Sequence, residues 1–363
     1  MSSQDQPARF RIWASSCSHL STDLAHGRRA FAEALAQSEA GGAAGGPPFE
    51  WDIALHLGDL SGTQTPPTDA EGPEVVAQFG SGRRHPRSHI YTVAGNHDAS
   101  GPEEEAQWWF RKWVDPLGAN TAVSGVDPAA MPFPVQGKWD RYAFDAGNIR
   151  VLMMSDRNDG GPPWGRGARG GYPSGRILRE TFDWWVDEVE RHADRIILSC
   201  HHYMLKETTA ASGPWEGFHR DAAGNLVSLF HGYYPDAGAE GASYLYWCDR
   251  TPDAQVFERY LAARPRAVDM WLGGHTHSVP DVRLAGRGLI EEKWGVTFLN
   301  VAALTKFHIG KLQRSAPMSR LLTFTEGSDE VVIGCYLHTD DYAPQGWFAP
   351  AERRVRLRHP FRP

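Results

Sequence analysis

The hydrophobic positions of this chain gather in short runs that predict buried strands, and polar residues follow directly after five of them. The five runs span residues 10–15, 51–57, 90–94, 195–200 and 268–272. Short apolar runs of this kind are typical of strands buried in the core of a sheet. We therefore expect the polar residues that follow them to converge on one edge of a sheet.

Helical spacing of apolar residues separates several of these strands. It predicts helices over residues 23–39, 102–114 and 179–192, and alternating residues predict further strands over 295–302 and 321–337. The repeated order of strand, helix and strand favours the α/β class, as a layered α/β/β/α sandwich. We expect one domain over residues 9–340 and a C-terminal extension over 341–363, whose basic stretch is a solvated tail or an edge strand.

The first two polar segments offer metal ligands of different character. Cys17 and His19 lie two residues apart, so in an extended stretch both side chains point to the same side and could bind one ion. Asp59 follows Gly58 at the end of the second strand, and its two carboxylate oxygens could bridge two cations.

The third segment suits both metal binding and catalysis. The amide oxygen of Asn96 is a suitable metal ligand. His97 is then available to face a substrate, and Asp98 to orient its ring.

The last two segments supply histidines. His201 and His202 follow the fourth strand, and His275 and His277 follow the fifth, again two residues apart. Taken singly, each segment has a structural alternative, because Gly-Asp or a paired histidine is usually a turn or a hydrogen-bonded surface residue. A lone cysteine is usually a small buried apolar residue. All five segments together, in order and each at a strand end, favour a metal site.

These five segments resemble the sequence blocks of the calcineurin-like metallophosphoesterases. The family blocks read Asp-x-His, Gly-Asp, Gly-Asn-His-Asp or Glu, a strand-end His, and Gly-His-x-His, and the resemblance covers about residues 9–308. The first block differs, since Cys17 replaces the family's Asp. Residues 14–17 resemble instead the Ala-Ser-Cys segment of PhoD-type alkaline phosphatases, which supplies a thiolate to an iron, although Gly62 stands where that subfamily has a metal-binding Tyr.

The resemblance implies a dinuclear site with divalent or trivalent ions. One ion would be held by Cys17, His19, Asp59 and His277, and the other by Asp59, Asn96, His201 and His275. A thiolate favours iron or zinc at the first position, and the second donor set suits manganese, zinc or iron. A water activated by the two ions becomes a hydroxide near neutral pH and attacks a phosphate ester in line, while His97 stabilises the transition state or protonates the leaving oxygen.

The resemblance thus predicts a metal-dependent hydrolase of phosphomonoesters or phosphodiesters. Two alternatives stay open: a partner-binding module on the same fold with a degraded metal site, which only the Cys17 replacement favours, and a hydrolase of another tetrahedral ester such as a sulfate. His202, Arg157 and Lys206 are candidates for phosphate contact, and surface salt bridges are the alternative role for Arg157 and Lys206.

Two stretches are predicted to be insertions that wall the site. Residues 156–176 are rich in Gly, Pro and Arg, which suits a loop over the metals. Residues 207–249 are rich in aromatic residues and suit a lid or pocket lining for an organic leaving group, or else pack on the core.

Charge and composition narrow the class of partner. The net charge of −7 argues against a protein that binds nucleic acid by neutralising phosphates. With the resemblance, which implies phosphoester hydrolysis, we expect a small-molecule phosphoester as substrate. No apolar run reaches the roughly 20 residues needed to span a bilayer. Residues 2–9 are polar, which is unlike a secretory signal, so we expect a cytoplasmic protein. Four cysteines in 363 residues are too few for a disulfide framework.

Overall fold

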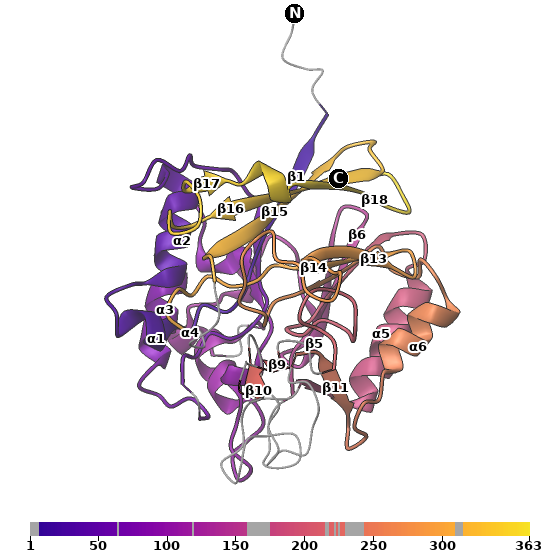
Figure 1. Cartoon of the computed structure of the whole chain (residues 1–363), viewed down its shortest axis with the longest axis horizontal. Coiled ribbons are helices and arrows are strands. Elements are labelled where there is room, and N and C mark those ends of the chain that lie inside the picture. The colour runs from indigo at the N-terminus through magenta and orange to yellow at the C-terminus, as the bar shows by residue number, and fades with distance from the viewer. Residues whose placement is uncertain are drawn as a thin grey trace, which may run out of the picture.

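The chain folds into two mixed β-sheets packed face to face, with helices on both outer sides, as Figure 1 shows. This computed structural model describes residues 7–63, 65–117, 120–157, 175–214, 218–220, 223, 226–228, 243–308 and 315–363. The arrangement confirms the predicted layered α/β sandwich. Within the described residues, no helix is long and apolar enough to cross a membrane.

The first sheet is built around three parallel strands and is extended by the C-terminal part of the chain. Its strand order is β17-β16-β15-β1-β2-β3, and β18 also pairs with β16. The strands are β1 (Arg9–Ser15), β2 (Ile53–His56), β3 (Ile90–Thr92), β15 (Met318–Thr325), β16 (Glu330–Leu337), β17 (Gly346–Trp347) and β18 (Arg353–Arg356). The basic stretch near the C-terminus is therefore an edge strand of this sheet.

The second sheet has the order β13-β14-β12-β8-β6-β5-β4, with β6, β8, β12 and β14 parallel. Its strands are β4 (Gln136–Lys138), β5 (Arg141–Ala146), β6 (Ile149–Met154), β8 (Ile196–Cys200), β12 (Met270–Gly273), β13 (Ile290–Lys293) and β14 (Val296–Asn300). Two short pairs lie outside the large sheets: β7 (Gly175–Ile177) with β11 (Leu245–Cys248), and β9 (Phe218–Arg220) with β10 (Leu226–Ser228).

The helices divide between the two outer faces. In Figure 1, α1 (Leu20–Leu24), α2 (Ala30–Ala40), α3 (Gly72–Phe79) and α4 (Thr121–Ser124) lie on one side, and α5 (Arg179–Arg191) and α6 (Val256–Ala263) lie on the other. Short turns of 3-10 or π geometry complete the set: η1 (Arg87–His89), η2 (Asn96–Asp98), η3 (Phe110–Val114), η4 (Pro128–Ala130) and η7 (Ala349–Ala351).

Because side chains alternate between the two faces of each strand, the apolar residues form three hydrophobic layers. Ile12 and Leu55 of the first sheet meet Leu198 and Leu272 of the second in the central layer. One residue along, Trp13 faces the helices that cover the first sheet, and Ile197 and Trp271 face those that cover the second. Because both faces of each central strand are covered, the strands read as continuous apolar runs rather than as alternating ones.

Two predicted helices are shorter than expected. The helix predicted over residues 23–39 is broken between α1 and α2, where Gly27 takes a φ of 77°. The carboxylate of Asp23 also accepts hydrogen bonds from residues 306 and 307, which fixes this turn from far along the chain. The helix predicted over 102–114 is reduced to η3, because Gln107 adopts a left-handed φ of 54°.

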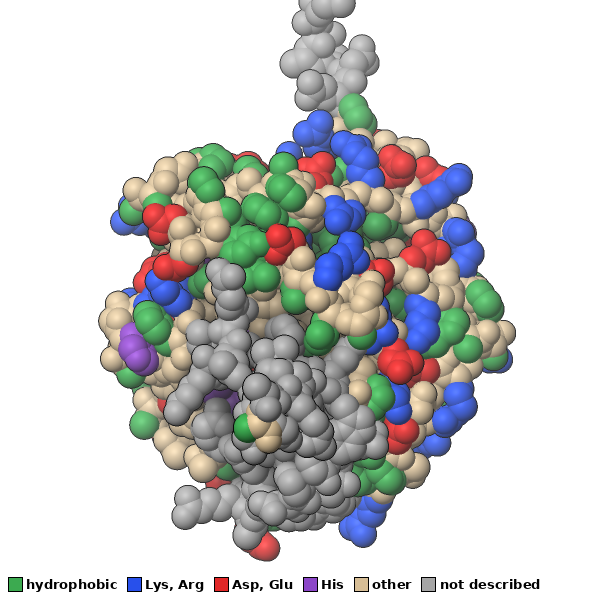
Figure 2. Space-filling view, viewed as in Figure 1, with side chains coloured by type: hydrophobic (Ala, Val, Ile, Leu, Met, Phe, Trp, Pro, Cys, Tyr) green, Lys and Arg blue, Asp and Glu red, His purple; other side chains and the backbone are tan. Residues whose placement is uncertain are grey.

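Figure 2 shows acidic and basic side chains interspersed over the right-hand part of the visible face, where α5 and α6 lie. Such mixing suits a surface exposed to water.

Candidate metal centre

The five polar segments meet where the parallel strands β1, β2, β3, β8 and β12 end. Backbone hydrogen bonds join them directly: Cys17 N–H donates to the Gly58 carbonyl (2.9 Å), and Gly274 N–H donates to the His202 carbonyl (2.8 Å). The carboxyl ends of neighbouring parallel strands thus bring residues from opposite ends of the sequence to one place. Every predicted ligand is buried.

Four residues of this site have an unusual backbone. The φ angles are 49° at Cys17, 39° at His19, 59° at Asp59 and 67° at His275. Left-handed conformations are costly for residues with a side chain, and they concentrate at functional sites where the surrounding structure enforces them. Here the sharp turns after the strands aim these side chains at a common point.

Four imidazole rings at the site share one tautomer, because each places its Nδ1 atom against a backbone carbonyl. A carbonyl only accepts, so Nδ1 carries the hydrogen and Nε2 keeps the lone pair in each neutral ring. The pairs are His19 with Ser61 (2.9 Å), His97 with Thr63 (2.6 Å), His202 with Leu57 (2.6 Å) and His277 with His308 (2.5 Å). This arrangement is typical of histidines prepared to bind metal through Nε2.

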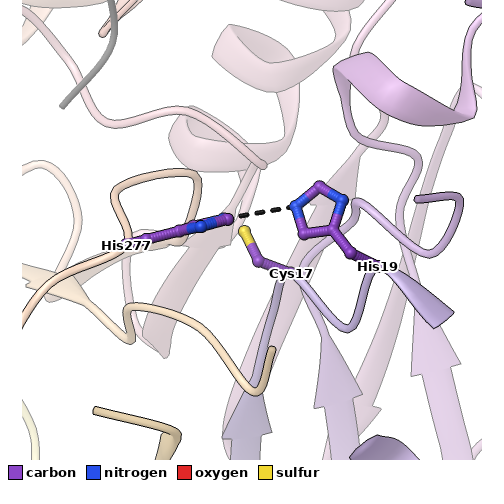
Figure 3. A group of neighbouring side chains, drawn as sticks. All are labelled: Cys17, His19 and His277. Atoms are coloured by element: carbon purple, nitrogen blue, oxygen red, sulfur yellow. Dashed lines mark hydrogen bonds between the residues drawn. The ribbon is translucent and has the colours of Figure 1, made fainter. Parts of the chain in front are cut away.

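The first group of ligand atoms comes from Cys17, His19 and His277, whose ligand atoms lie within 4.8 Å of one another. The Nε2 atoms of His19 and His277 are 3.2 Å apart. When both rings are neutral, two lone pairs face each other across this contact, which favours a cation between them. Nitrogens bound to one tetrahedral zinc ion lie about 3.4 Å apart, which fits the observed separation. Figure 3 shows the sulfur and both rings turned toward one another.

The second group centres on Asp59. Its Oδ2 atom lies 3.1 Å from Nε2 of His202, which in turn lies 3.2 Å from Nδ1 of His275. The Nε2 atom of His19 is 3.6 Å from the same carboxylate oxygen, so Asp59 lies between the two groups. Both polar side-chain atoms of Asn96 are buried without a hydrogen-bond partner. A buried amide oxygen without a hydrogen-bond partner is suited to bind a cation.

His201 lies on the other side of the second sheet, contrary to the sequence expectation. Its Nδ1 accepts a hydrogen bond from the Tyr203 N–H (2.9 Å), and its ring lies near Trp271. The single lone pair of the ring is therefore already used, and Nε2–H is buried without a partner. The alternation of β8 explains this, because Leu198 and Cys200 face the central layer and position 202 shares their side.

Asp98 also has a different role from the one expected. Its carboxylate accepts four backbone hydrogen bonds, from the N–H groups of Asp59, Gly95, Leu60 and Ser61 (2.9–3.0 Å). The ring of His97 is oriented instead by the Thr63 carbonyl. Asp98 thus fixes the loop that carries Asp59 and ties it to the third segment.

Burial and neighbouring charges together set the pKa values at the site. It lowers the pKa of His19 well below its usual value, with the charges of His308 and His97 adding to the effect. Burial also raises the pKa of the Cys17 thiol, and Asp59 raises it further. For Asp59, burial opposes ionisation, but the charges of His202 and His97 outweigh it and bring the pKa well below its usual value.

The balance between burial and neighbouring charge also sets the pKa values of His202 and Asp98, the two groups next to Asp59. Burial tends to lower the pKa of His202, but the charge of Asp59 and their hydrogen bond raise it above the usual value. Burial and the charge of Asp59 raise the pKa of Asp98 to about 7. Apart from His202, whose pKa Asp59 raises, burial favours the neutral thiol of Cys17 and the neutral imidazole of His19 around this carboxylate, and bound cations would supply further positive charge.

The two candidate phosphate-binding cations are engaged elsewhere. Lys206 forms an ion pair with Asp253 (2.9 Å) and lies over the Tyr244 ring. The guanidinium of Arg157 lies over the Trp139 ring at 5.0 Å. Most of the first predicted insertion falls on residues 158–174, which lie outside the described residues. About half of the second falls on residues 215–217, 221–222, 224–225 and 229–242, which also lie outside them.

Two features of the site were not anticipated. His308 contacts the site, although no sequence motif includes it. Its carbonyl accepts a hydrogen bond from His277, and its ring stacks on His19. Gly62 lies against α1, where an added Cβ would meet the side-chain oxygens of Ser21 and Thr22 at 2.5 Å. A tyrosine therefore has no room at this position in this backbone.

The chain was compared with protein families, with curated proteins and with solved structures. The model of the family described as calcineurin-like phosphoesterase matches residues 10–279. Among solved structures, Vacuolar Protein Sorting 29 from Cryptosporidium parvum is similar, with 12% identity, coverage of 96% of this chain and 98% of that chain, and a TM-score of 0.34. Vps29 from Chaetomium thermophilum gives 10% identity, 98% and 97% coverage, and a TM-score of 0.32. No curated protein matches the chain.

Proposed function

Because the chain belongs to the calcineurin-like phosphoesterase family, we propose that it is a hydrolase of phosphate esters that works with two metal ions. The observation that carries the proposal is the convergence of imidazole Nε2 atoms, each of which offers a lone pair to a metal ion once it is free of a proton. His19, His202 and His277 each give Nδ1–H to a backbone carbonyl, and their Nε2 atoms lie against another ligand atom of the site.

We assign the first ion to Cys17, His19, Asp59 and His277, and the second to Asp59, Asn96, His202 and His275. His202 replaces His201 in this set, because its Nε2 faces Asp59 while the lone pair of His201 is bonded to Tyr203. The thiolate of Cys17, as in PhoD-type phosphatases, favours iron or zinc over magnesium at the first position. Imidazole, amide and carboxylate ligands at the second suit manganese, zinc or iron.

Two bound cations supply Lewis acidity and an activated water for attack on phosphorus. The chain's own residues supply the rest. Asp98 holds the backbone N–H groups of residues 59–61 and so fixes the bridging carboxylate. The ring of His97 lies beside that of His19, with centroids 4.7 Å apart. The backbone N–H of His97 donates to Asp59 Oδ1 (2.8 Å). Its Nε2 is the atom that would contact the leaving oxygen of the ester.

The proposal is tested by assaying metal-free protein, reloaded with Fe, Mn or Zn, on aryl phosphomonoesters and phosphodiesters and on an aryl sulfate. We expect phosphoester hydrolysis that is lost with chelator and restored by metal. An Asp59→Asn variant should lose activity with every metal, since the bridging charge is gone. Metal-loaded protein that cleaves none of the phosphoesters would contradict the proposal, and cleavage of the sulfate alone would reassign the substrate class.

A further inference from the structure

Residues 304–308 lie against the first metal group, outside all five sequence blocks. Leu304 N–H donates to the Ser16 carbonyl (3.0 Å), and Thr305 N–H donates to the Cys17 carbonyl (2.9 Å). The backbone of this segment is therefore continuous with the turn that carries Cys17.

A buried carboxylate holds the segment in place. Asp23 accepts hydrogen bonds from the N–H groups of Lys306 (3.1 Å) and Phe307 (3.2 Å) and from the Thr305 hydroxyl. Its charge is balanced by Arg28, 2.6 Å away. This buried network makes a rigid support for the residues that lead to His308, although Nη2 of Arg28 is buried without a partner among the described residues.

The ring of His308 is fixed on two sides. It stacks on His19 with centroids 3.8 Å apart and planes 5° from parallel. Its Nδ1 lies 3.1 Å from the hydroxyl of Thr22, whose single hydrogen goes to the Gly62 carbonyl (2.9 Å). The hydroxyl must then accept, so His308 donates from Nδ1.

The backbone of His308 holds the second histidine of the same metal group. Its carbonyl accepts the Nδ1–H of His277 (2.5 Å), which sets the tautomer that leaves Nε2 for metal. His308 thus contacts both histidines of the first group, one through its ring and one through its carbonyl.

His308 is poorly placed to be a ligand itself. The ligand atoms of His19, His97 and His308 lie within 4.8 Å of one another. His19, however, already directs Nε2 at His277 and gives Nδ1–H to Ser61. A third ion at this place would therefore have only the imidazoles of His97 and His308 as ligands. Even an open metal site usually has three protein ligands.

We infer that His308 is a positioning residue that orients His19 and His277 toward the first metal ion, an inference that rests on the proposed dinuclear site. Removing the His308 ring takes away the stacking that fixes the plane of the His19 ring. The His308 carbonyl, which accepts a hydrogen bond from His277, stays in place. Supporting contacts of this kind change metal affinity by about 10- to 100-fold. The second ion does not depend on His308, so its affinity should stay the same.

The test is a titration of metal-free protein with cobalt(II), following the thiolate-to-cobalt absorption band that reports binding beside Cys17. In His308→Ala the dissociation constant for the ion that gives this band should rise about 10- to 100-fold. In His308→Phe, which keeps a stacked ring, most of the affinity should return. His26→Ala is the matched control, because that exposed ring stacks on Phe307 at 4.3 Å and lies outside the metal groups.

The outcomes separate the two claims. A His308→Ala titration equal to that of the wild type overturns the inference alone. A wild type without the thiolate band overturns the proposed site, and the inference with it. If His308→Ala does not fold by circular dichroism, His308→Leu decides, since it keeps an apolar side chain of similar size but has no ring to stack on His19: weaker binding at the band supports the inference, and unchanged binding overturns it.

Discussion

Nε2 of His202 lies 3.1 Å from the Asp59 carboxylate, whereas the ring of the adjacent His201 lies across the sheet beside Trp271. Two neighbouring histidines thus occupy opposite faces of one strand end. The pair provides a direct test, because substitutions one residue apart should have different effects on metal binding.

His202→Ala should lose the second ion and most activity, while His201→Ala should keep both ions. The reason is that only His202 directs its Nε2 atom at Asp59. Metal content after gel filtration measures the difference. Unfolding by urea reports whether His201→Ala lowers the free energy of unfolding, by roughly 1–3 kcal/mol for a buried side chain. Loss of an ion in His201→Ala with retention in His202→Ala would reverse the assignment.

His97→Ala should retain both metal ions but slow turnover by roughly two or more orders of magnitude, as the loss of an acid or charge stabiliser typically does. The rate at saturating substrate, measured beside metal content, checks this. A rate equal to that of the wild type would show that the role is misassigned.

Asp98→Asn should destabilise the fold, because one carboxylate accepts four backbone hydrogen bonds and an amide offers only one acceptor oxygen. Leaving buried N–H groups unpaired costs about 1–3 kcal/mol each, so we expect a loss of roughly 2–4 kcal/mol. Denaturant unfolding measures it. Asp69→Asn, at an exposed ion pair with Lys112, is the matched control and should leave stability nearly unchanged.

Glu258 should make stability depend on pH. Burial raises its pKa from 4.5 to about 7 in the folded chain. Between these values the folded state binds more protons than the unfolded state, so the free energy of unfolding falls as pH rises, by up to about 3 kcal/mol. Melting temperatures of the wild type and Glu258→Gln from pH 4 to 8 check this. The variant should be the more stable protein at pH 8, whereas parallel curves would rule the effect out; exposed Glu103→Gln is the control.

The strands and the five segments were predictable because each rests on local information: an apolar run followed by polar residues. The choice between His201 and His202 was also within reach, since Leu198 and Cys200 set the alternation of β8. The break near Gly27 was not, because it depends on hydrogen bonds that Asp23 accepts from residues about 280 positions away. The part played by His308 likewise arises only from tertiary contacts.

The most direct test is the metal content of purified protein, measured by elemental mass spectrometry for the wild type, Cys17→Ala and Cys335→Ala. Cys335 is also buried, but it lies on β16 among apolar residues and serves as the control. We predict two ions per chain in the wild type and in Cys335→Ala, and one in Cys17→Ala. No ion in the wild type, or an equal count in all three proteins, would contradict a dinuclear site with a thiolate ligand.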